Sequence, residues 1–430
     1  MNFSSLSKFF RIFALFAIPI LLFYVFFQPL SPQVHHHGSG HSKKSAVVRA
    51  PLTPKEKAQV VSRGSYQCTL PPGRKLAIAQ KRWYHTEVFG FIFEYALACS
   101  HSVIVYHTQG HVTSALDLYL ALFPFLEVEV RNIEFIDKEH EEYDAIFFTT
   151  PDDDINADFR YGIQHKSVYL AHLTHPKFIQ RWHTLRLHMS PLAGYPFIIP
   201  AYRGDVPMIP AEVRAREIIM VGTVHDGSNY NIRNVLDFFK GASEKGWKAK
   251  IFTRYWGSQE KIPDYIEVVY DSPTDAMFKA VQRASYILIF PNDNSWYLSD
   301  RVTGALPLAI SAVTPIVTTT DFAELYEYSP ELHGVVSGSD IESMVQALDM
   351  SPASYVSLVS SLSSYRSRLM RNNFAVIEMT LSGVPEIAAS VSQEKEENGP
   401  TSEAAAHSEA GNFLPLSKFY SKRRRPETGF

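Results

Sequence analysis

The sequence has few cysteines, little net charge and no glycine-rich phosphate-binding signature. Its two cysteines, Cys68 and Cys99, can form one disulfide in an oxidising compartment or remain thiols in a reducing one, and the sequence alone leaves both open. The formal net charge is −3 over 430 residues, so composition gives no reason to expect a nucleic-acid partner. Because neither a P-loop nor a G-x-G-x-x-G pattern occurs, a binding site has to be sought from the order of strands and loops.

Charged residues are also absent from a long stretch near the N-terminus. After Arg11 no Lys, Arg, Asp or Glu occurs before Lys43, and residues 12–27 form an uninterrupted apolar run. The run is close to the roughly 17–25 residues that span a bilayer, and no small-x-small cleavage site follows it. The basic flank is expected to stay in the cytosol. The sequence therefore predicts a cytosolic tail at 1–11 and a transmembrane signal anchor at 12–28, with a cleaved signal peptide as the alternative.

The rest of the chain divides into a stem, two folded blocks and a tail. Residues 29–72 are rich in proline and lack apolar periodicity, which predicts a flexible stem. Residues 386–430 are rich in Glu, Ser, Ala and Lys, which predicts a disordered tail. Between them we expect an N-terminal Rossmann-like domain at 73–205 and a C-terminal one at 206–385, joined by a proline-bearing linker at 200–216.

Apolar runs alternate with stretches of helical spacing in both blocks, which favours an α/β fold with parallel sheets and helices on both faces. Strands are predicted at 76–79, 103–106, 128–130, 145–148 and 168–170, and then at 218–222, 250–252, 266–269, 286–290 and 315–317. Helices are predicted at 87–99, 113–123, 231–242, 274–284, 300–310 and 352–382. Thr274 with Asp275 suggests a capped helix start, and Pro307 suggests an interruption of its helix.

Polar loops follow two strands of the first block. His85 and Glu87 lie in the loop after the first strand, where either could act as a general base on an acceptor hydroxyl; a polar loop that caps a helix is the alternative. Asp152 and Asp154 follow the fourth strand, and their Asp-x-Asp spacing could hold Mn²⁺ or Mg²⁺ on a diphosphate. Acidic turns of this kind are also common without a metal.

The first strand of the second block is followed by Gly222 and Thr223, and then by a helix that carries Arg233. A glycine-bearing loop ahead of a helix can present backbone N–H groups to phosphate, and a nearby arginine can assist. Arg254, after the next strand, is a second candidate. An ordinary strand-to-helix turn would have the same pattern.

A more specific order of elements spans residues 286–317. An apolar strand is followed by a polar loop, then by Asp300 ahead of a small-residue helix, and then by the strand Thr314-Pro315-Ile316-Val317. This order resembles the nucleotide-sugar site of GT-B glycosyltransferases with an exostosin- or GT4-like donor domain. In those sites a Glu-x7-Glu helix precedes a Gly-Thr-Pro-Val strand. The second acidic position of that pattern falls on Leu308, which cannot hydrogen-bond a ribose.

The resemblance implies roles for several residues. Asp300 would hold hydroxyls of the donor sugar, and Thr303 and Gly304 would bring backbone N–H groups to the donor. Arg301, with Arg233 or Arg254, would neutralise the leaving diphosphate.

The resemblance implies a GT-B enzyme with two Rossmann-like domains facing a cleft. The anchor and the stem suit a single-pass type II protein of the Golgi or another secretory-pathway membrane, with its globular part in the lumen. It would move a sugar from a nucleotide sugar to a glycan or glycoconjugate acceptor, without a required cofactor. Mn²⁺ or Mg²⁺ enters only in an alternative, GT-A-like interpretation through Asp152 and Asp154. Leu308 supports another alternative, a non-catalytic glycan-binding or scaffold protein, and a two-lobed binding protein without nucleotide affinity is a third.

Overall fold

The computed structural model describes residues 66–80, 88–107, 113–149, 166–171, 185–189, 197–205, 207–225, 230–292, 295–298, 303–326, 334–337 and 340–383. The predicted anchor, residues 29–65 of the predicted stem and the predicted tail lie outside these residues, so these assignments stay predictions. The end of the predicted stem is instead packed on the fold, with Leu70 only 5% exposed and Cys68 bonded to Cys99. Within the described part of the chain, no helix is both long enough and apolar enough to span a bilayer.

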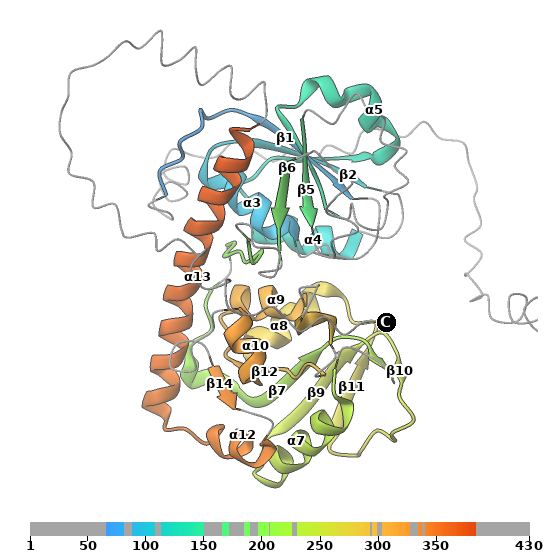
Figure 1. The fold of residues 1–430 in the computed structure, drawn as a ribbon, viewed down its shortest axis with the longest axis vertical. Coiled ribbons are helices and arrows are strands. Elements are labelled where there is room, and N and C mark those ends of the chain that lie inside the picture. The colour runs from blue at the N-terminus through green and yellow to red at the C-terminus, as the bar shows by residue number, and fades with distance from the viewer. Residues whose placement is uncertain are drawn as a thin grey trace, which may run out of the picture. The chain divides into compact units, whose positions relative to one another are not determined.

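The first folded half is built on a six-stranded parallel sheet in the order β3-β2-β1-β4-β5-β6 (Figure 1). Its strands are β1 (Lys75–Gln80), β2 (Ser102–His107), β3 (Val128–Asn132), β4 (Ala145–Phe148), β5 (Ser167–Ala171) and β6 (Leu185–His188). The central strand β1 is buried from its second residue onward. Burial of this kind explains why it reads in the sequence as a continuous apolar run.

The second half repeats this strand order with β11-β9-β7-β12-β13-β14, again all parallel. Its strands are β7 (Ala215–Val221), β9 (Lys248–Thr253), β11 (Ile266–Tyr270), β12 (Ala284–Ile289), β13 (Ile316–Thr319) and β14 (Gly334–Ser337). Beyond the ends of β7 and β9, a two-stranded sheet pairs β8 (Val224–His225) with β10 (Trp256–Gly257). Parallel strands need crossover connections, which are usually helices, and helices lie between most successive strands.

Helices cover both faces of each sheet. The main helices are α3 (Val88–Ala98), α4 (Thr113–Leu122), α5 (Ile136–Glu139), α7 (Ile232–Glu244), α8 (Thr274–Arg283), α9 (Ala305–Ala312), α10 (Thr320–Leu325), α12 (Ile341–Ala347) and α13 (Pro352–Leu381). In β7, Ile219 belongs to the core that contains α8 and α9, whereas Ile218 and Met220 belong to the core that contains α7 and α12. This alternation follows from the two-residue period of a strand.

One hydrophobic core extends over both halves. It contains Ile78 of β1 together with α3 and α4, and Ile219 of β7 together with α8 and α9. Tyr202, in the connection between the halves, stacks on Phe278 of α8 with ring centroids 6.0 Å apart. A Cβ added at Gly90 of α3 would lie 2.3 Å from the Tyr202 ring, so only glycine lets α3 approach this ring so closely.

Most of the predicted elements are present near their predicted positions, and the predicted α/β class with parallel sheets is confirmed. Three details were wrong. Helix α9 begins at Ala305 with Gly304 as its N-cap, rather than at residue 300. Pro307 does not interrupt this helix, because it lies in the first turn, where backbone N–H groups have no partner within the helix. The N-cap of α8 is Pro273 and makes no side-chain capping bond, so Thr274 is not the cap.

Candidate functional site

The strand order of the second half locates a candidate binding site. From β7 the chain moves to β9 and β11 on one side, and then returns to β12 on the other side of β7. Such a reversal is a topological switch point, and open α/β sheets bind ligands there, beyond the carboxyl ends of the strands. The segments that leave the sheet at this point follow β7 and β12. They contain the predicted residues Gly222, Thr223, Thr303 and Gly304.

Gly222 leaves β7 in a conformation that requires glycine. Its φ is +155°, and an added Cβ would lie 2.5 Å from a ring carbon of Tyr230. The N–H of Gly222 donates to the carbonyl of Phe252 at 3.0 Å, which ties the start of the loop to β9. Thr223 is partly buried beside it. The backbone at the carboxyl end of β7 is therefore held against a buried aromatic ring.

The hydroxyl of Tyr230 connects the two loops of the switch point. It donates to the carbonyl of Val221 at 3.1 Å and lies 3.3 Å from Thr303 Oγ1. Thr303 Oγ1 also accepts from the N–H of Ala305, at the start of α9, at 3.3 Å. Burial raises the pKa of Tyr230 well above its usual value, so this hydroxyl stays protonated. The Thr303 side chain is thus buried and engaged in contacts within the protein, while Gly304 next to it is exposed.

Helix α7 begins at the same place. Asn231 is its N-cap, and the Asn231 side-chain oxygen accepts from the N–H of Asn234 at 3.2 Å. The N–H of Asn231 donates to the carbonyl of Phe290 at 3.2 Å, just after β12. The N-terminus of a helix carries a partial positive charge that favours anions, so the end of β12 and the start of α7 together form a suitable position for a phosphate group.

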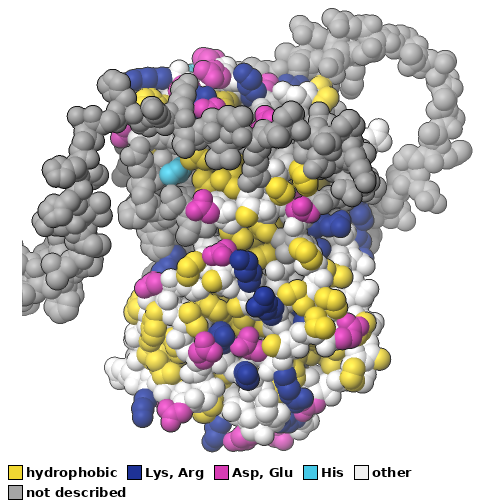
Figure 2. Space-filling model, turned by 180° about the vertical axis from the view of Figure 1, so that it is seen from behind, with side chains coloured by type: hydrophobic (Ala, Val, Ile, Leu, Met, Phe, Trp, Pro, Cys, Tyr) yellow, Lys and Arg dark blue, Asp and Glu magenta, His cyan; other side chains and the backbone are white. Residues whose placement is uncertain are grey.

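Charged and aromatic side chains lie around this edge of the sheet. Arg254 is exposed just after β9. Arg233 is 84% exposed and pairs with Glu260 at 3.3 Å, so its guanidinium is already directed toward the segment after β10. Tyr255 is 50% exposed, and its ring is parallel to that of His225 with centroids 6.1 Å apart. Basic and acidic side chains of the second half are interspersed on the face shown in Figure 2.

The switch point of the first sheet lies between β1 and β4. The predicted residues His85 and Glu87 follow β1 in the sequence, and Asp152 and Asp154 follow β4, but all four lie outside the described residues. Asp300 and Arg301 lie outside them as well. Their roles therefore stay predictions. The end of β4 is held to β1 by Thr149, whose N–H and hydroxyl both donate to the carbonyl of Ala79, at 3.1 and 3.3 Å.

Leu308 belongs to the hydrophobic core. It is 9% exposed within α9 and contributes to the large cluster shared by both halves. Its position is therefore used for packing and carries no ligand-binding group. The sequence had given no role to Tyr230, His225 or Tyr255, because single aromatic residues give no periodic or spacing signal.

One group of potential metal ligands occurs among the described residues, formed by Cys68, Cys99 and Glu378. The two sulfurs of this group are joined in a disulfide, so they are not free to bind a metal in this state.

Comparisons with known proteins do not assign the chain to a family. No protein-family model matches it, and no curated protein sequence matches it significantly. Several solved structures resemble its fold at low identity. HepE of Anabaena, determined with UDP-glucose, has 11% identity and a TM-score of 0.46, with 74% of this chain and 100% of that chain covered. An α-glucosyltransferase bound to UDP-glucose and abasic DNA has 11% identity and a TM-score of 0.48, with 68% and 95% covered. The lipopolysaccharide glycosyltransferase WaaG has 10% identity and a TM-score of 0.37, again with 68% and 95% covered. Likenesses at this level do not transfer an activity or a ligand to this chain.

Proposed function

We propose that this protein is a glycosyltransferase that moves a sugar from a nucleotide-sugar donor to a glycan or glycoconjugate acceptor. The observation that carries the proposal is the switch point of the second sheet. There Gly222, the Tyr230–Thr303 contact and the start of α7 come together at the carboxyl ends of β7 and β12. This arrangement presents the N-terminus of α7 to a diphosphate at the switch point.

The sequence pattern at residues 286–317 supports the same proposal. It combines an apolar strand, a polar loop with Asp300 and a small-residue helix before Thr-Pro-Ile-Val. In the proposed mechanism Asp300 holds donor hydroxyls, and Arg301 with Arg233 or Arg254 neutralises charge that develops on the departing diphosphate. The enzyme would position the acceptor hydroxyl, and His85 or Glu87 would remove its proton. The anchor at 12–28 would hold the enzyme in a secretory-pathway membrane, with the globular part in the lumen.

A second candidate function is supported by Leu308. In the resembled pattern this position is acidic, but here it packs in the core of the protein. A protein that kept the fold without this carboxylate could bind glycans or act as a scaffold without catalysing transfer.

The proposal can be tested by thermal unfolding of the full-length chain with UDP, GDP, CDP and the corresponding nucleotide sugars. We expect one nucleotide to stabilise the protein, because a ligand that binds only the folded state raises its stability. If none does, a donor site is excluded and the scaffold function is favoured. In an active preparation, turnover that survives Asp300→Ala would show that the donor-hydroxyl assignment is wrong.

A pair of glycine variants localises the nucleotide. Gly222→Ala places a Cβ against Tyr230 at a φ of +155°, whereas Gly246→Ala, at a φ of +80°, has nothing within 4 Å of the new Cβ. Both should lose some stability from backbone strain. Only Gly222→Ala should also lose the stabilisation by the nucleotide. Equal nucleotide responses in the two variants would place the ligand elsewhere.

A further inference from the structure

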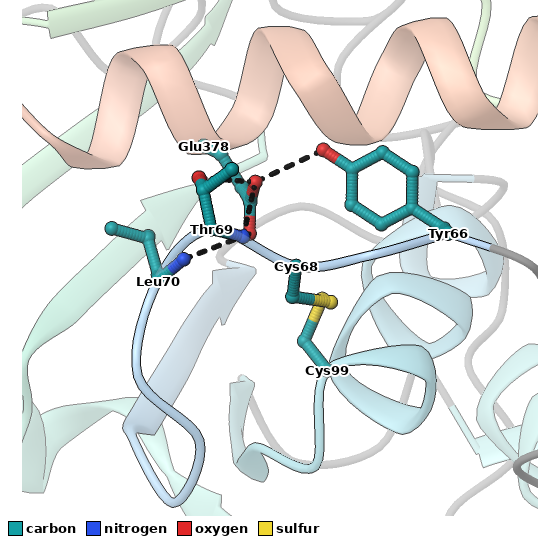
Figure 3. The surroundings of a disulfide bond; sticks show 6 residues. All are labelled: Tyr66, Cys68, Thr69, Leu70, Cys99 and Glu378. Atoms are coloured by element: carbon teal, nitrogen blue, oxygen red, sulfur yellow. Dashed lines mark hydrogen bonds between the residues drawn. A yellow bond between two sulfur atoms is a disulfide. The ribbon is translucent and has the colours of Figure 1, made fainter. Parts of the chain in front are cut away.

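Residues 66–70, called the strap below, connect the end of α3 to α13 (Figure 3). Within the strap, Cys68 is joined by a disulfide to Cys99, which directly follows α3. The ring of Tyr66 packs edge-on against Phe374 of α13, with centroids 5.2 Å apart. The strap therefore has a covalent contact on one side and a non-covalent contact on the other.

The non-covalent contact centres on Glu378 of α13, a residue that is only 4% exposed. The N–H of Thr69 donates to both of its oxygens, at 2.9 and 3.0 Å, and the Thr69 hydroxyl donates at 2.6 Å. The N–H of Leu70 and the hydroxyl of Tyr66 donate at 3.3 and 3.0 Å. Figure 3 shows these strap groups directed at the one carboxylate. A buried anion requires such donors, because without them it loses its hydration and gains nothing in return.

Helix α13 is also bonded to other parts of the protein along its length. Near its start, the Tyr355 hydroxyl donates to the carbonyl of Ser285 in β12 at 2.7 Å. Arg366 donates to the carbonyl of Ser311 in α9 at 2.7 Å. The Asn373 amide donates to the carbonyl of Ile199 at 2.7 Å. The strap is thus the hydrogen-bonded contact nearest the C-terminal end of a helix that also contacts the second half.

We propose that the Cys68–Cys99 disulfide is a redox-sensitive latch that holds the C-terminal end of α13 on the first half. While the bond is intact, the strap is kept beside α3 and presents its N–H groups to Glu378. A dithiol reductant would transfer two electrons and two protons to the bond. The S–S bond then breaks, two thiols form, and the reductant becomes a disulfide. The freed strap has more conformations available, and Glu378 then exchanges strap donors for water as the end of α13 loosens.

This inference is independent of the proposed transfer reaction, because it concerns neither switch point. It is readily testable, because the chain contains only two cysteines. Any effect of a reductant on the protein must therefore act through this one bond.

The test is hydrogen exchange of the full-length chain with and without dithiothreitol. We expect reduction to accelerate exchange by about tenfold or more in residues 66–70 and 374–383. Residues 352–366 should be unaffected, because their contacts involve the second half. Unchanged exchange at 374–383 would overturn the proposal. Equal acceleration along the whole chain would also overturn it, because the disulfide would then stabilise the whole fold rather than the end of α13.

Variants separate the two contacts of the strap. Cys68→Ser with Cys99→Ser should exchange rapidly at 374–383 and no longer respond to dithiothreitol. Glu378→Gln should exchange rapidly there even with the disulfide intact, because a neutral amide cannot satisfy the same set of donors. Glu342→Gln, an exposed glutamate of α12, is the matched control and should leave exchange at 374–383 unchanged. Full protection at 374–383 in oxidised Glu378→Gln would contradict the latch.

Discussion

The amino-terminal edges of the two sheets both contact α13, but they bury their polar groups in different ways. At the first sheet the buried groups are charged. Glu378 receives the strap donors, and Arg74, just before β1, pairs with Asp144, just before β4, at 3.2 Å. A disulfide lies beside them.

At the second sheet the contacts are made mainly by neutral groups. The Tyr355 hydroxyl donates to a carbonyl of β12, and the Ser285 hydroxyl donates to the carbonyl of Ala215 in β7 at 2.8 Å. The charged group is Arg214, which donates to the Thr314 hydroxyl at 3.3 Å and to the Ala284 carbonyl at 3.5 Å. The first edge contains a buried histidine, His101, as well as the disulfide, so it should respond to both pH and redox state. Arginine stays protonated at ordinary pH, so the second edge should respond to neither.

The largest expected difference is acid sensitivity at the first edge, through His101. Burial, followed by the positive charge of Arg74, lowers the pKa of His101 from 6.5 to about 4. Neither ring nitrogen has a hydrogen-bond partner among the described residues. The unfolded chain therefore takes up a proton as the pH falls through 6.5, whereas the folded chain does so only near pH 4. The free energy of unfolding thus falls between these two pH values, by about 3 kcal/mol in total. Below the lower value it levels off.

Urea unfolding of the wild type and of His101→Phe at about pH 7.5 and about pH 4.5 measures this effect. The variant should lose less stability on acidification, by about 2.5 kcal/mol. If both proteins lose the same amount, the acid response of the first edge arises elsewhere.

A smaller effect is expected at the second edge from Tyr355→Phe. The change removes the 2.7 Å hydrogen bond to Ser285 and leaves that buried carbonyl without its hydroxyl donor, which should cost about 1 kcal/mol. Tyr286→Phe is the matched control, because the rings of Tyr286 and Tyr355 are in contact and the Tyr286 hydroxyl is buried with no partner among the described residues. Chemical denaturation should show little or no loss for the control. Equal losses would mean that ring packing, rather than the hydrogen bond, is being measured.

The smallest effect is expected from Arg214→Met. Burial lowers the pKa of Arg214, and its hydrogen bonds of 3.3 to 3.5 Å are long. The cost of burying the charge should offset most of what these bonds contribute, so a methionine of similar length should change the free energy of unfolding by less than about 1 kcal/mol. A loss well above that, measured by urea unfolding, would show that the second edge depends on charge as the first one does.

The agreement between sequence and structure is best for elements with strong local signals. Helix α13 was expected at 352–382 and spans Pro352–Leu381. Its start was predictable because proline is tolerated in the first turn of a helix. The start of α9 was misplaced, because Gly304 has no capping side chain and the preceding Thr303 is held by Tyr230 from a distant loop. The short strands β6 and β14 were not predicted, because their sequences, Leu-Arg-Leu-His and Gly-Val-Val-Ser, lack the continuous apolar run that identified the equally short β4.

The candidate site was predictable only in part. Gly222 was recognisable from its place between a strand and a helix, and the structure adds that its backbone packs on Tyr230. Arg233 was grouped with the diphosphate-binding residues, and this role stays a prediction; the structure adds that its exposed guanidinium pairs with Glu260. Nothing in the local sequence distinguishes Glu378 from an exposed glutamate of a long helix, since its partners lie more than 300 residues earlier in the chain.

By itself, the sequence determined the alternation of strands and helices and the class of fold, because apolar periodicity and runs are local properties of the chain. The tertiary structure alone decided the strand order, the position of the switch points, the disulfide and the burial of Glu378. Each of these depends on contacts between residues far apart in the sequence. Such contacts form only when the whole set of strands and helices packs together, and no local pattern records them.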